Sequence, residues 1–214
     1  MDIQTLILHS FFSTFRTFWW IIPLLLITLF LKSAVFKGWF GEKLVRTRAA
    51  STLDATKYQA FHDLIIPDNR GTTQIDHIYL SRFGIFVVET KHYQGWIYGS
   101  EQQARWTQII YRKKSSFQNP LRQNYRHIKA LSSLLGLPES CFHSVVVFSG
   151  NYQFKTKMPP NVCDLANFDR YIKTFQTALL SPQQIETTAA VLLSPNFTAT
   201  PAKKREHVRA LQAR

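Results

Sequence analysis

Cysteine is scarce in this sequence. Its 214 residues include only Cys141 and Cys163, and neither belongs to a CxxC pair. A zinc ribbon needs paired cysteines and a disulfide framework needs several, so both classes of small domain are excluded. We interpret the two thiols as small, buried, apolar side chains.

Acidic residues are also few. The chain has 13 Asp and Glu against 26 Lys and Arg, which gives a formal net charge of +13 and an isoelectric point near 10.0. Such an imbalance predicts an anionic partner, either nucleic acid or an acidic lipid surface, and the charge alone does not distinguish them. Internal repeats and low-complexity stretches are absent, and 45% of the residues are hydrophobic. We therefore expect one ordinary globular domain plus a short appendage.

Charge is missing altogether from residues 17–31, and extending this apolar run to residue 36 adds only Lys32. About 20 such residues match the ~30 Å hydrocarbon core of a bilayer. Trp19 and Trp20 lie near one end of the run, where interfacial aromatic residues are found, and Pro23 predicts a kink that does not prevent a span. We expect one transmembrane helix over about residues 15–36, with residues 1–36 forming a membrane anchor.

Two alternatives to an anchor are a cleaved signal peptide and the buried core helix of a soluble protein. No Lys or Arg precedes Arg16, and bulky residues follow the candidate cleavage site at Ser33-Ala34, so a signal peptide is disfavoured. The length of the run and its tryptophans disfavour a core helix. One basic residue precedes the run and five follow by residue 48, so the positive-inside rule places the C-terminal domain in the cytoplasm, at the inner membrane of a bacterial-type cell.

The remainder of the chain predicts a single α/β domain over residues 37–196, with a central mixed sheet flanked by helices, and a basic tail over residues 197–214. Apolar residues at helical spacing, or runs typical of strands, define the expected elements. Helices are expected at 39–55, 119–135, 168–180 and 182–193, and strands at 61–66, 72–80, 85–93, 96–98, 107–111 and 145–148. Asn119 and Pro120 are a capping residue and a first helical residue, and Gly136 ends that helix.

Two neighbouring strands carry the residues that indicate chemistry. If residues 81–84 form the loop of a hairpin, Leu80 faces Ile85, and the same register places Asp76 opposite Glu89. Cross-strand partners have Cβ atoms ~4.5–5.5 Å apart. One sheet face then holds four polar residues: Gln74, Asp76, Glu89 and Lys91. A bulge at Gly84 would shift this register and separate them.

Apolar residues surround these four on both faces of the strand pair. The polar face continues with Ile78, Leu80, Ile85 and Val87, and the opposite face carries Ile75, Tyr79, Phe86 and Val88. Two adjacent carboxylates in such a setting repel each other and are costly to desolvate, and a divalent cation would remove both penalties. The alternative for Glu89 and Lys91 alone is a surface ion pair that contributes little.

Motifs spread over residues 37–137 resemble the nuclease-related domain, NERD. The matching pieces are Gly41-Glu42-Lys43, Thr73-Gln74-Ile75-Asp76-His77, Gly84-Ile85-Phe86-Val87-Val88-Glu89-Thr90-Lys91, Gly95, Trp106-Thr107-Gln108 and Asn119-Pro120-Leu121-Arg122-Gln123-Asn124. Their order and spacing make the match specific, and it covers about half of the chain.

This resemblance implies a restriction-endonuclease-like fold of the PD-(D/E)xK superfamily. It implies Asp76, Glu89 and Lys91 as the catalytic core, with Gln123 from the following helix beside them. Glu42 would join Asp76 and Glu89 in holding Mg²⁺ or Mn²⁺. The reaction implied is metal-assisted hydrolysis of phosphodiester bonds in nucleic acid, with DNA the expected substrate. Related nucleases often form dimers, which makes a homodimer one possible assembly, and the sequence itself leaves the oligomeric state open.

Basic residues outside this core form two groups. Arg122, Arg126 and Lys129 recur along one stripe of the expected helix, and Arg112, Lys113 and Lys114 precede it. We expect both groups to contact phosphates, the alternative for the stripe being a solvated helix face.

The sequence is less specific about the roles of the histidine and tryptophan residues near the motifs. His77 and His92 should alternate to the far side of the sheet, whereas His127 lies one turn after Gln123 and could approach the site. We interpret Trp96 and Trp106 as closing the core or lining the cleft rather than as a base-stacking platform.

Three functions are compatible with these features. The leading one is a membrane-anchored, metal-dependent nuclease. The second is a non-catalytic module that tethers nucleic acid or a protein partner at the membrane. The third uses the positive charge to bind acidic lipid beside the anchor. The intact set of two acids and a lysine favours the first.

Overall fold

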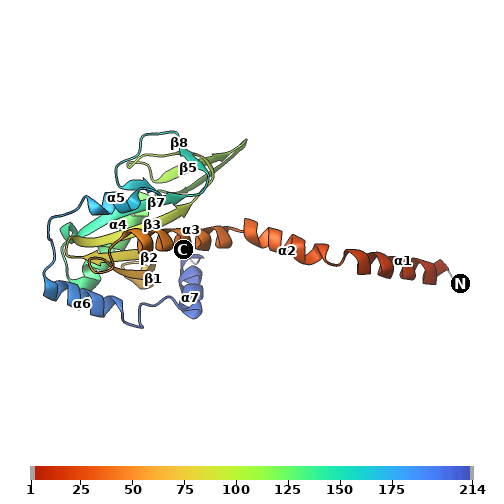
Figure 1. Ribbon diagram of the computed structural model, residues 1–214, viewed down its shortest axis with the longest axis horizontal. Helices are drawn as coiled ribbons and strands as arrows, with labels where there is room; N and C mark the ends of the chain where they lie inside the picture. Colours follow the sequence, from red (N-terminus) through yellow and green to blue (C-terminus); the bar gives the residue numbers. More distant parts are fainter. Residues whose placement is uncertain (1–2, 213–214) are drawn as a thin grey trace. The chain divides into compact units, whose positions relative to one another are not determined.

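A computed structural model describes residues 3–212 (Figure 1). The chain divides into two units, residues 1–40 and residues 41–214.

The N-terminal unit is helical. It contains α1 (Ile3–Phe18), α2 (Ile21–Lys32) and the first turns of α3 (Ala34–Thr52). The single helix expected over residues 15–36 is thus interrupted, at Trp19-Trp20 and again at Ser33. Pro23 explains the first break, because its ring clashes with the carbonyl four residues earlier, that of Trp19. The Trp19 carbonyl instead accepts from Ile22 N in a tighter turn, at 3.2 Å.

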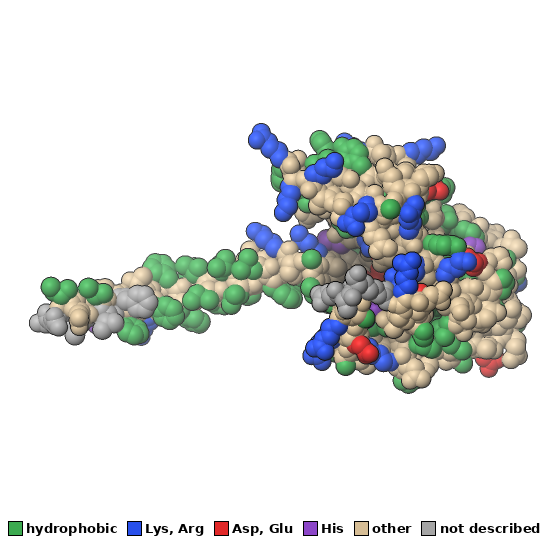
Figure 2. All heavy atoms as spheres, turned by 180° about the vertical axis from the view of Figure 1, so that it is seen from behind, with side chains coloured by type: hydrophobic (Ala, Val, Ile, Leu, Met, Phe, Trp, Pro, Cys, Tyr) green, Lys and Arg blue, Asp and Glu red, His purple; other side chains and the backbone are tan. Residues whose placement is uncertain are grey.

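The apolar helices of this unit contain the segment that we expect to anchor the protein in a membrane. Among residues 3–212, no single helix is both long and apolar enough to cross a bilayer. The segments Phe12–Phe18 and Ile21–Lys32 meet those criteria together, with a bend of 46° between them. No side chain of α2 is buried, and Figure 2 shows the hydrophobic side chains along these helices. The bend agrees with the expected kink, and the membrane span itself stays a prediction.

The second unit is built on a five-stranded mixed sheet in the order β1-β2-β3-β7-β9. The strands are β1 (Gln59–Asp68), β2 (Gly71–Ser81), β3 (Gly84–His92), β7 (Phe142–Ser149) and β9 (Val162–Asp164). Strand β2 is antiparallel to both β1 and β3, whereas β7 is parallel to β3 and β9 is parallel to β7. The expected α/β class with a mixed sheet is confirmed.

A second, smaller sheet has the order β6-β5-β4-β8. Its strands are β4 (Gly95–Tyr98), β5 (Arg105–Ile110), β6 (Lys113–Gln118) and β8 (Tyr152–Phe154). Ile97 and Trp106 are fully buried and pack with Val146 and Phe148 of the large sheet. The sequence did not predict β6, β8 or β9, and residues 112–114 belong to the β5–β6 hairpin.

Helices cover both faces of the large sheet (Figure 1). Residues of α4 (Pro120–Leu135) and α6 (Pro182–Leu192) share one core cluster with β1, β2 and β3. Residues of α3 and α5 (Phe168–Lys173) share another on the opposite face. The remaining helices are the short η1 (Glu139–Cys141) and α7 (Pro201–Gln212). The flanked sheet follows from apolar residues on both faces of β2 and β3.

The caps of α4 and the β2–β3 register confirm two predictions. Asn119 Oδ1 accepts from Leu121 N at 2.9 Å, and Gly136 ends the helix in the left-handed region with φ 65°. Leu80 pairs with Ile85, so Gly84 makes no register shift, but the ladder ends at the pair of His77 with Val88 and the expected pair of Asp76 with Glu89 does not form.

The expected alternation along β2 is wrong at one point. Ile75 packs in the same cluster as Ile78, under α4, rather than on the opposite face with Tyr79. The cause lies in β1, where Asp63 adopts a left-handed φ of 56°. The pairs on either side of Asp63 and Asp76 keep one register, but these two residues do not pair. The interruption resets the alternation of side chains in both strands.

Candidate functional site

A polar hollow of about 340 Å³ opens at the edge where β2 and β3 separate. Six elements contribute to it: α3, β2, β3, β6, α4 and α7. Its lining includes all five residues expected to form the catalytic and metal-binding set: Glu42, Asp76, Glu89, Lys91 and Gln123. Residues far apart in the sequence therefore converge on one place.

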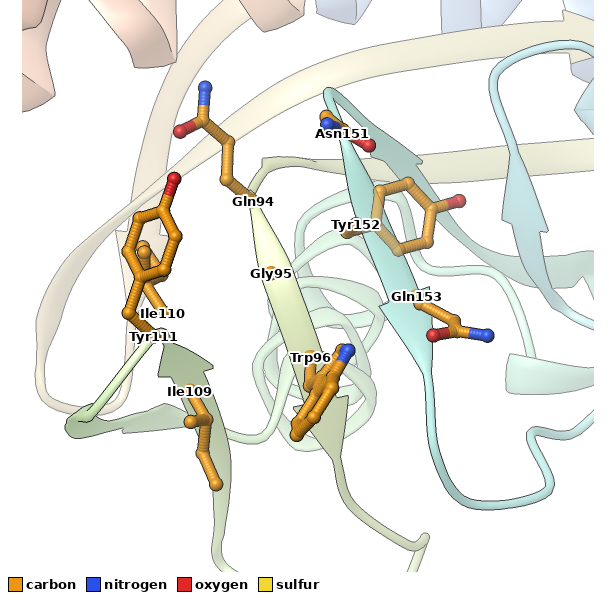
Figure 3. A pocket seen from close by; sticks show the side chains of 9 residues that line it. All are labelled: Gln94, Gly95, Trp96, Ile109, Ile110, Tyr111, Asn151, Tyr152 and Gln153. Carbon is orange, nitrogen blue, oxygen red and sulfur yellow. The ribbon is translucent and has the colours of Figure 1, made fainter.

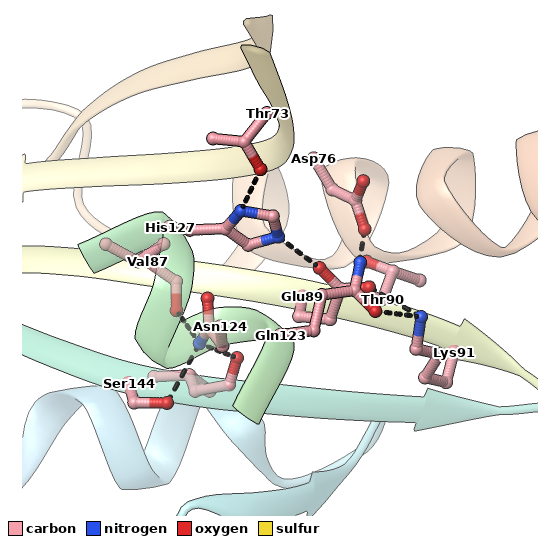
Figure 4. A network of polar contacts seen from close by, with 11 residues as sticks. Thr73, Asp76, Val87, Glu89, Thr90, Lys91, Gln123, Asn124, His127 and Ser144 are labelled. Carbon is pink, nitrogen blue, oxygen red and sulfur yellow. Dashed lines mark hydrogen bonds and ion pairs between the residues drawn. The ribbon is translucent and has the colours of Figure 1, made fainter. Parts of the chain in front are cut away.

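Lys91 lies at the centre of a chain of polar contacts (Figure 4). Its Nζ donates to Glu89 Oε1 at 2.6 Å and to Gln123 Oε1 at 3.0 Å. Glu89 and Lys91 are two residues apart on β3 and so share a face of the strand, and Gln123 reaches them from the first turns of α4. The ammonium is held by one charged and one neutral acceptor.

His127 holds the other oxygen of Glu89. Its Nε2 lies 3.0 Å from Glu89 Oε2, and its Nδ1 lies 2.9 Å from Thr73 Oγ1 (Figure 4). An ionised carboxylate only accepts hydrogen bonds, so Nε2 carries the proton that faces Glu89. Thr73, His127 and Glu89 are each buried, so this arrangement is fixed by packing. The sequence left open whether His127 approaches the site, and the structure places it there.

Asp76 lies where the ladder between β2 and β3 stops. The last pair before it is His77 with Val88. Beyond that pair, Asp76 Oδ2 accepts from the backbone N–H of Thr90 at 2.8 Å. The side chain of Asp76 thus accepts a hydrogen bond from the backbone of β3, and this bond holds its carboxylate beside the other acids.

Glu42 enters from α3, next to a glycine that permits close packing. A Cβ at Gly41 would lie 2.8 Å from the Cβ of His92 and 3.3 Å from Ser149 Oγ. Only glycine therefore lets this turn of α3 approach β3 and β7 so closely. The following residue, Glu42, lines the hollow.

The three acids differ in their protonation. Burial, reinforced by the negative charges of Glu89 and Glu42, raises the pKa of Asp76 well above its usual value. Burial, with a contribution from Asp63, also raises the pKa of Glu42. Burial alone would raise the pKa of Glu89, but Lys91 and His127 outweigh it and lower that pKa to about 2. Glu89 is the acid that stays ionised.

The donor chemistry of the hollow fits a hard divalent cation. Among residues 3–212, no three His, Cys, Asp or Glu side chains are close enough together to hold one ion. Magnesium does not need such a cage, since it keeps several waters and usually takes one or two carboxylates. Carboxylates of three elements line the hollow, and burial, followed by neighbouring negative charges, raises the pKa of two of them, a cost that a cation would offset.

The two basic groups differ in their surroundings. Each cation of the α4 stripe has a partner within the protein. Arg122 donates to Gln102 O at 2.5 Å, Arg126 is paired with Asp68, and Lys129 lies 2.5 Å from Glu139. Arg126 also lines the hollow. By contrast, Arg112, Lys113 and Lys114 are exposed at the β5–β6 turn, and no ion pair to another described residue involves them.

Residues outside the hollow behave as expected with one exception. His77 Nδ1 lies 2.9 Å from His62 Nδ1, His92 Nδ1 lies 2.9 Å from Ser149 Oγ, and neither His77 nor His92 lines the hollow. Trp106 is fully buried, as expected, whereas Trp96 is 48% exposed on the outer face of the small sheet. Trp96 therefore does not close the core.

One lining residue, His207, was not predicted from the sequence. It comes from α7, in the segment expected to be a basic tail, and its Nδ1 lies 2.7 Å from Thr72 Oγ1. The helical pattern of the tail was visible, but nothing in it indicated which part of the sheet it would contact.

Comparison with known proteins identifies a family. The model of the nuclease-related domain, NERD, matches residues 37–149, which is more than half of the chain. An uncharacterized protein of Bacillus anthracis is 58% identical over 101 residues, which is 47% of this chain and 47% of that protein. The chain thus spans about half the length of this relative. The matched family region contains α3 from Lys37, the β1–β3 meander, α4 and β7.

Proposed function

The chain belongs to the nuclease-related domain family, and from that membership we propose that it is a membrane-anchored, metal-dependent nuclease. It would hydrolyse phosphodiester bonds of nucleic acid, with DNA as the expected substrate. The observation that carries the proposal is the convergence of Lys91 with Glu89, Asp76 and Gln123 around one open hollow.

Lys91 is the residue whose geometry is most informative. Its ammonium is largely buried yet lines an open hollow, with Glu89 and Gln123 fixing its position. Burial lowers the pKa of Lys91, but the attraction of Glu89 outweighs it and the net pKa is raised, so the charge is retained. A fixed positive charge beside a bound phosphate would orient a water molecule or stabilise the charge that develops on the phosphate.

Mg²⁺ or Mn²⁺ would take one or two of the carboxylates of Glu42, Asp76 and Glu89 as ligands and would keep waters at its other positions. When bound, the ion would activate a water and offset charge on the scissile phosphate. His127 and Thr73 would keep Glu89 in one orientation, as outer partners of metal ligands commonly do. Arg126, fixed by Asp68, would add a positive charge at the rim of the hollow for the substrate backbone.

The membrane anchor is part of the same proposal. The exposed apolar side chains of α2 and the bent pair of helices support a kinked span. With more basic residues after this segment than before it, the domain would face the cytoplasm at the inner membrane.

A non-catalytic binding module is the second candidate, and one observation favours it. Both oxygens of Glu89 already have protein partners, Lys91 and His127, so a metal would have to share that carboxylate or displace a contact. A protein of this kind would bind nucleic acid without cleaving it.

Cleavage by the full chain in detergent, with Mg²⁺ or Mn²⁺ supplied, distinguishes the two candidates. We expect the wild type to degrade DNA, EDTA to stop it, and Lys91→Ala to lower the rate by at least about 100-fold, as loss of a charge-stabilising group does. Lys57→Ala is the matched control, because Lys57 also pairs with an acid, Asp54, but on the surface. Cleavage by Lys91→Ala at the wild-type rate would refute the catalytic assignment, and metal-supplied wild type that binds but never cleaves would favour the binding module.

A further inference from the structure

A second hollow, of about 590 Å³, lies on the outer face of the small sheet (Figure 3). It shares no lining residue with the first hollow. Its walls come from β4, β5 and β8 and from the turns that flank them. Aromatic and amide side chains dominate the lining, so the chemistry differs from that of the acidic hollow.

Trp96 provides the largest aromatic surface of this hollow. It stands in a row of cross-strand neighbours, between Ile109 of β5 and Gln153 of β8. Tryptophan has a large apolar surface whose burial is strongly stabilising. Trp96 is nevertheless 48% exposed, in contrast to the fully buried Trp106 of the adjacent strand. Lys155 Nζ lies 4.6 Å from the centre of its ring, where it leaves part of the ring open.

Gly95 lines the hollow beside Trp96. It has φ 78°, and a Cβ there would lie 2.3 Å from the carbonyl oxygen of Ile109 on the neighbouring strand, so only glycine fits at this position. It therefore adds no side chain to the lining between Trp96 and Gln94.

Tyr111 stands at the rim, in the left-handed backbone conformation that a two-residue hairpin turn favours but that tyrosine rarely adopts. It is the first residue of the two-residue β5–β6 turn, with φ 53°, a region that disfavours bulky side chains and that glycine or asparagine occupies more readily. Its side chain is 97% exposed, so packing within the protein does not compensate for this strain. A strained, exposed aromatic residue at a turn is best explained by contact with a ligand.

Three amide side chains surround the aromatic surface: Gln94, Asn151 and Gln153 (Figure 3). All three are exposed, and no hydrogen bond to another described residue involves their side-chain amides. Each amide can donate and accept at once. Planar ligands with mixed donors and acceptors at their edges suit such a lining.

Positive charge flanks the hollow on two sides. Arg112, Lys113 and Lys114 follow Tyr111 directly, and Lys155 lies above Trp96. We propose that this hollow binds nucleobases of single-stranded nucleic acid, with Trp96 and Tyr111 stacking on bases and the neighbouring cations contacting phosphates. Stacking aromatics beside a basic track are the usual means of binding single strands, and a duplex does not present free base faces. This proposed role differs from the expectation that Trp96 closes the core or lines the cleft rather than stacking on bases.

The location of the hollow deepens the proposed nuclease function and rests on it. Gln94 follows Lys91 by three residues, so their Cα atoms are at most about 11 Å apart. At the other side, β6 begins at the basic turn and ends at Gln118, which lines the acidic hollow. Bases held at Trp96 would belong to the strand whose backbone enters the acidic hollow. The substrate class that follows is single-stranded or locally unpaired nucleic acid.

Binding without cleavage tests this proposal directly. The full chain in detergent and EDTA is titrated into three fluorescein-labelled probes of equal length: oligothymidylate, an abasic strand and a duplex. We expect Trp96→Ala to raise the Kd for oligothymidylate about tenfold, the loss of one base–aromatic stack. The Kd values for the abasic strand and the duplex should not change. Trp96→Phe, which keeps an aromatic face, should restore oligothymidylate binding.

Tyr125→Ala is the matched control, because Tyr125 is 54% exposed and also has a lysine, Lys129, near its ring at 5.6 Å. It should leave all three Kd values unchanged. Unchanged oligothymidylate binding by Trp96→Ala, or an equal loss on the abasic strand, would overturn the proposal. Adding metal separates the two hypotheses: cleavage by wild type with Trp96-independent binding refutes only the base site, and Trp96-dependent binding without cleavage refutes only the nuclease.

Discussion

Glu89, Asp76 and Glu42 line one hollow, but their individual environments differ. Lys91 and His127 hold Glu89 ionised, whereas burial and neighbouring charges favour the protonated form of Asp76. Burial and the neighbouring charges thus disfavour the charged form of Asp76 in the metal-free protein. A cation would compete with a proton for this carboxylate, so metal affinity should rise with pH.

Asp76→Asn should stabilise the metal-free protein at neutral pH. A carboxyl whose folded-state pKa is raised contributes stability that is present below its unfolded pKa, near 3.8, and is lost as the pH rises through the folded value. Asparagine removes that loss and keeps an oxygen for the Thr90 N–H. We expect a gain of about 1 kcal/mol at pH 7, or about 2–4 °C in Tm, that disappears below about pH 4.

Thermal unfolding in EDTA across this pH range provides the measurement. Asp54→Asn is the control with the opposite sign, because the hydroxyl and N–H of Thr56 lower the pKa of that exposed acid. A Tm for Asp76→Asn below that of wild type at pH 7 would show that Asp76 is ionised and well compensated in the folded state.

Several site residues could be predicted from sequence because their relation is local. The i, i+2 spacing of Glu89 and Lys91 and the capped start of the helix that carries Gln123 are independent of the rest of the fold. Asp63 could not be predicted to matter, because its left-handed conformation depends on the strand opposite. Arg126 was expected to face solvent or phosphate, but its pairing with Asp68 across the sheet is a tertiary contact.

At the scale of elements, α4 carries the parts of the site that the strands lack. Gln123 and His127 are one helical turn apart, and Asn124 between them faces the sheet. Asn124 Nδ2 donates to Val87 O at 2.8 Å, to Ser144 Oγ at 2.9 Å and to Val145 O at 3.2 Å. One fully buried amide thus links α4 to both β3 and β7.

Asn124→Ala should therefore loosen the helix on the sheet. Removing the amide leaves buried acceptors unsatisfied, and we expect a loss of about 1–3 kcal/mol in the free energy of unfolding. Chemical denaturation of the full chain measures this loss. Ser133→Ala, an exposed position on the same helix, should change it by less than about 0.5 kcal/mol. Equal effects of the two substitutions would show that the amide does not anchor α4.

The elements that sequence analysis missed lack a pattern of their own. Strand β6 reads Lys113-Lys114-Ser115-Ser116-Phe117-Gln118, with one apolar residue, and it exists because β5 supplies a partner along its whole length. Strands β8 and β9 have three residues each, too few for alternation to be visible. By contrast, the long β2–β3 hairpin and the capped α4 have strong local signals, and both were predicted correctly.

At the scale of the whole molecule, the positive charge is unevenly available. Figure 2 shows many Lys and Arg side chains and few acidic ones on the face in view. The cations of the α4 stripe are already bound to oxygens of the protein, whereas those of the β5–β6 turn are exposed. The formal net charge therefore overstates the number of cations that are free to bind a nucleic acid at the α4 stripe, but not at the β5–β6 turn.

Replacing Arg112, Lys113 and Lys114 together by alanine should reduce the salt dependence of single-strand binding. Each phosphate contact contributes about 0.7 to the slope of log K against log salt concentration, so the slope should fall by about 2. Fluorescence anisotropy at several salt concentrations measures it. The stripe variant with Arg122 and Lys129 replaced by alanine serves as the comparison and should lower the slope by less. A larger effect of the stripe would reverse this ranking.

The chain covers only part of the related protein. It spans about half of the Bacillus anthracis protein, and the match is confined to 101 residues. The family match over residues 37–149 includes every lining residue of the acidic hollow except His207. The membrane anchor and a homodimer stay predictions.

The β5–β6 turn described above has a consequence for how this fold can diversify. The acidic hollow is carried by regular strands and helices, whereas Tyr111 and Arg112 form an exposed two-residue turn. Exposed turn tips tolerate insertion and substitution far better than the elements that support them. Changes in the length or composition of this turn would therefore alter which ligands the protein binds. The residues of the acidic hollow would stay the same.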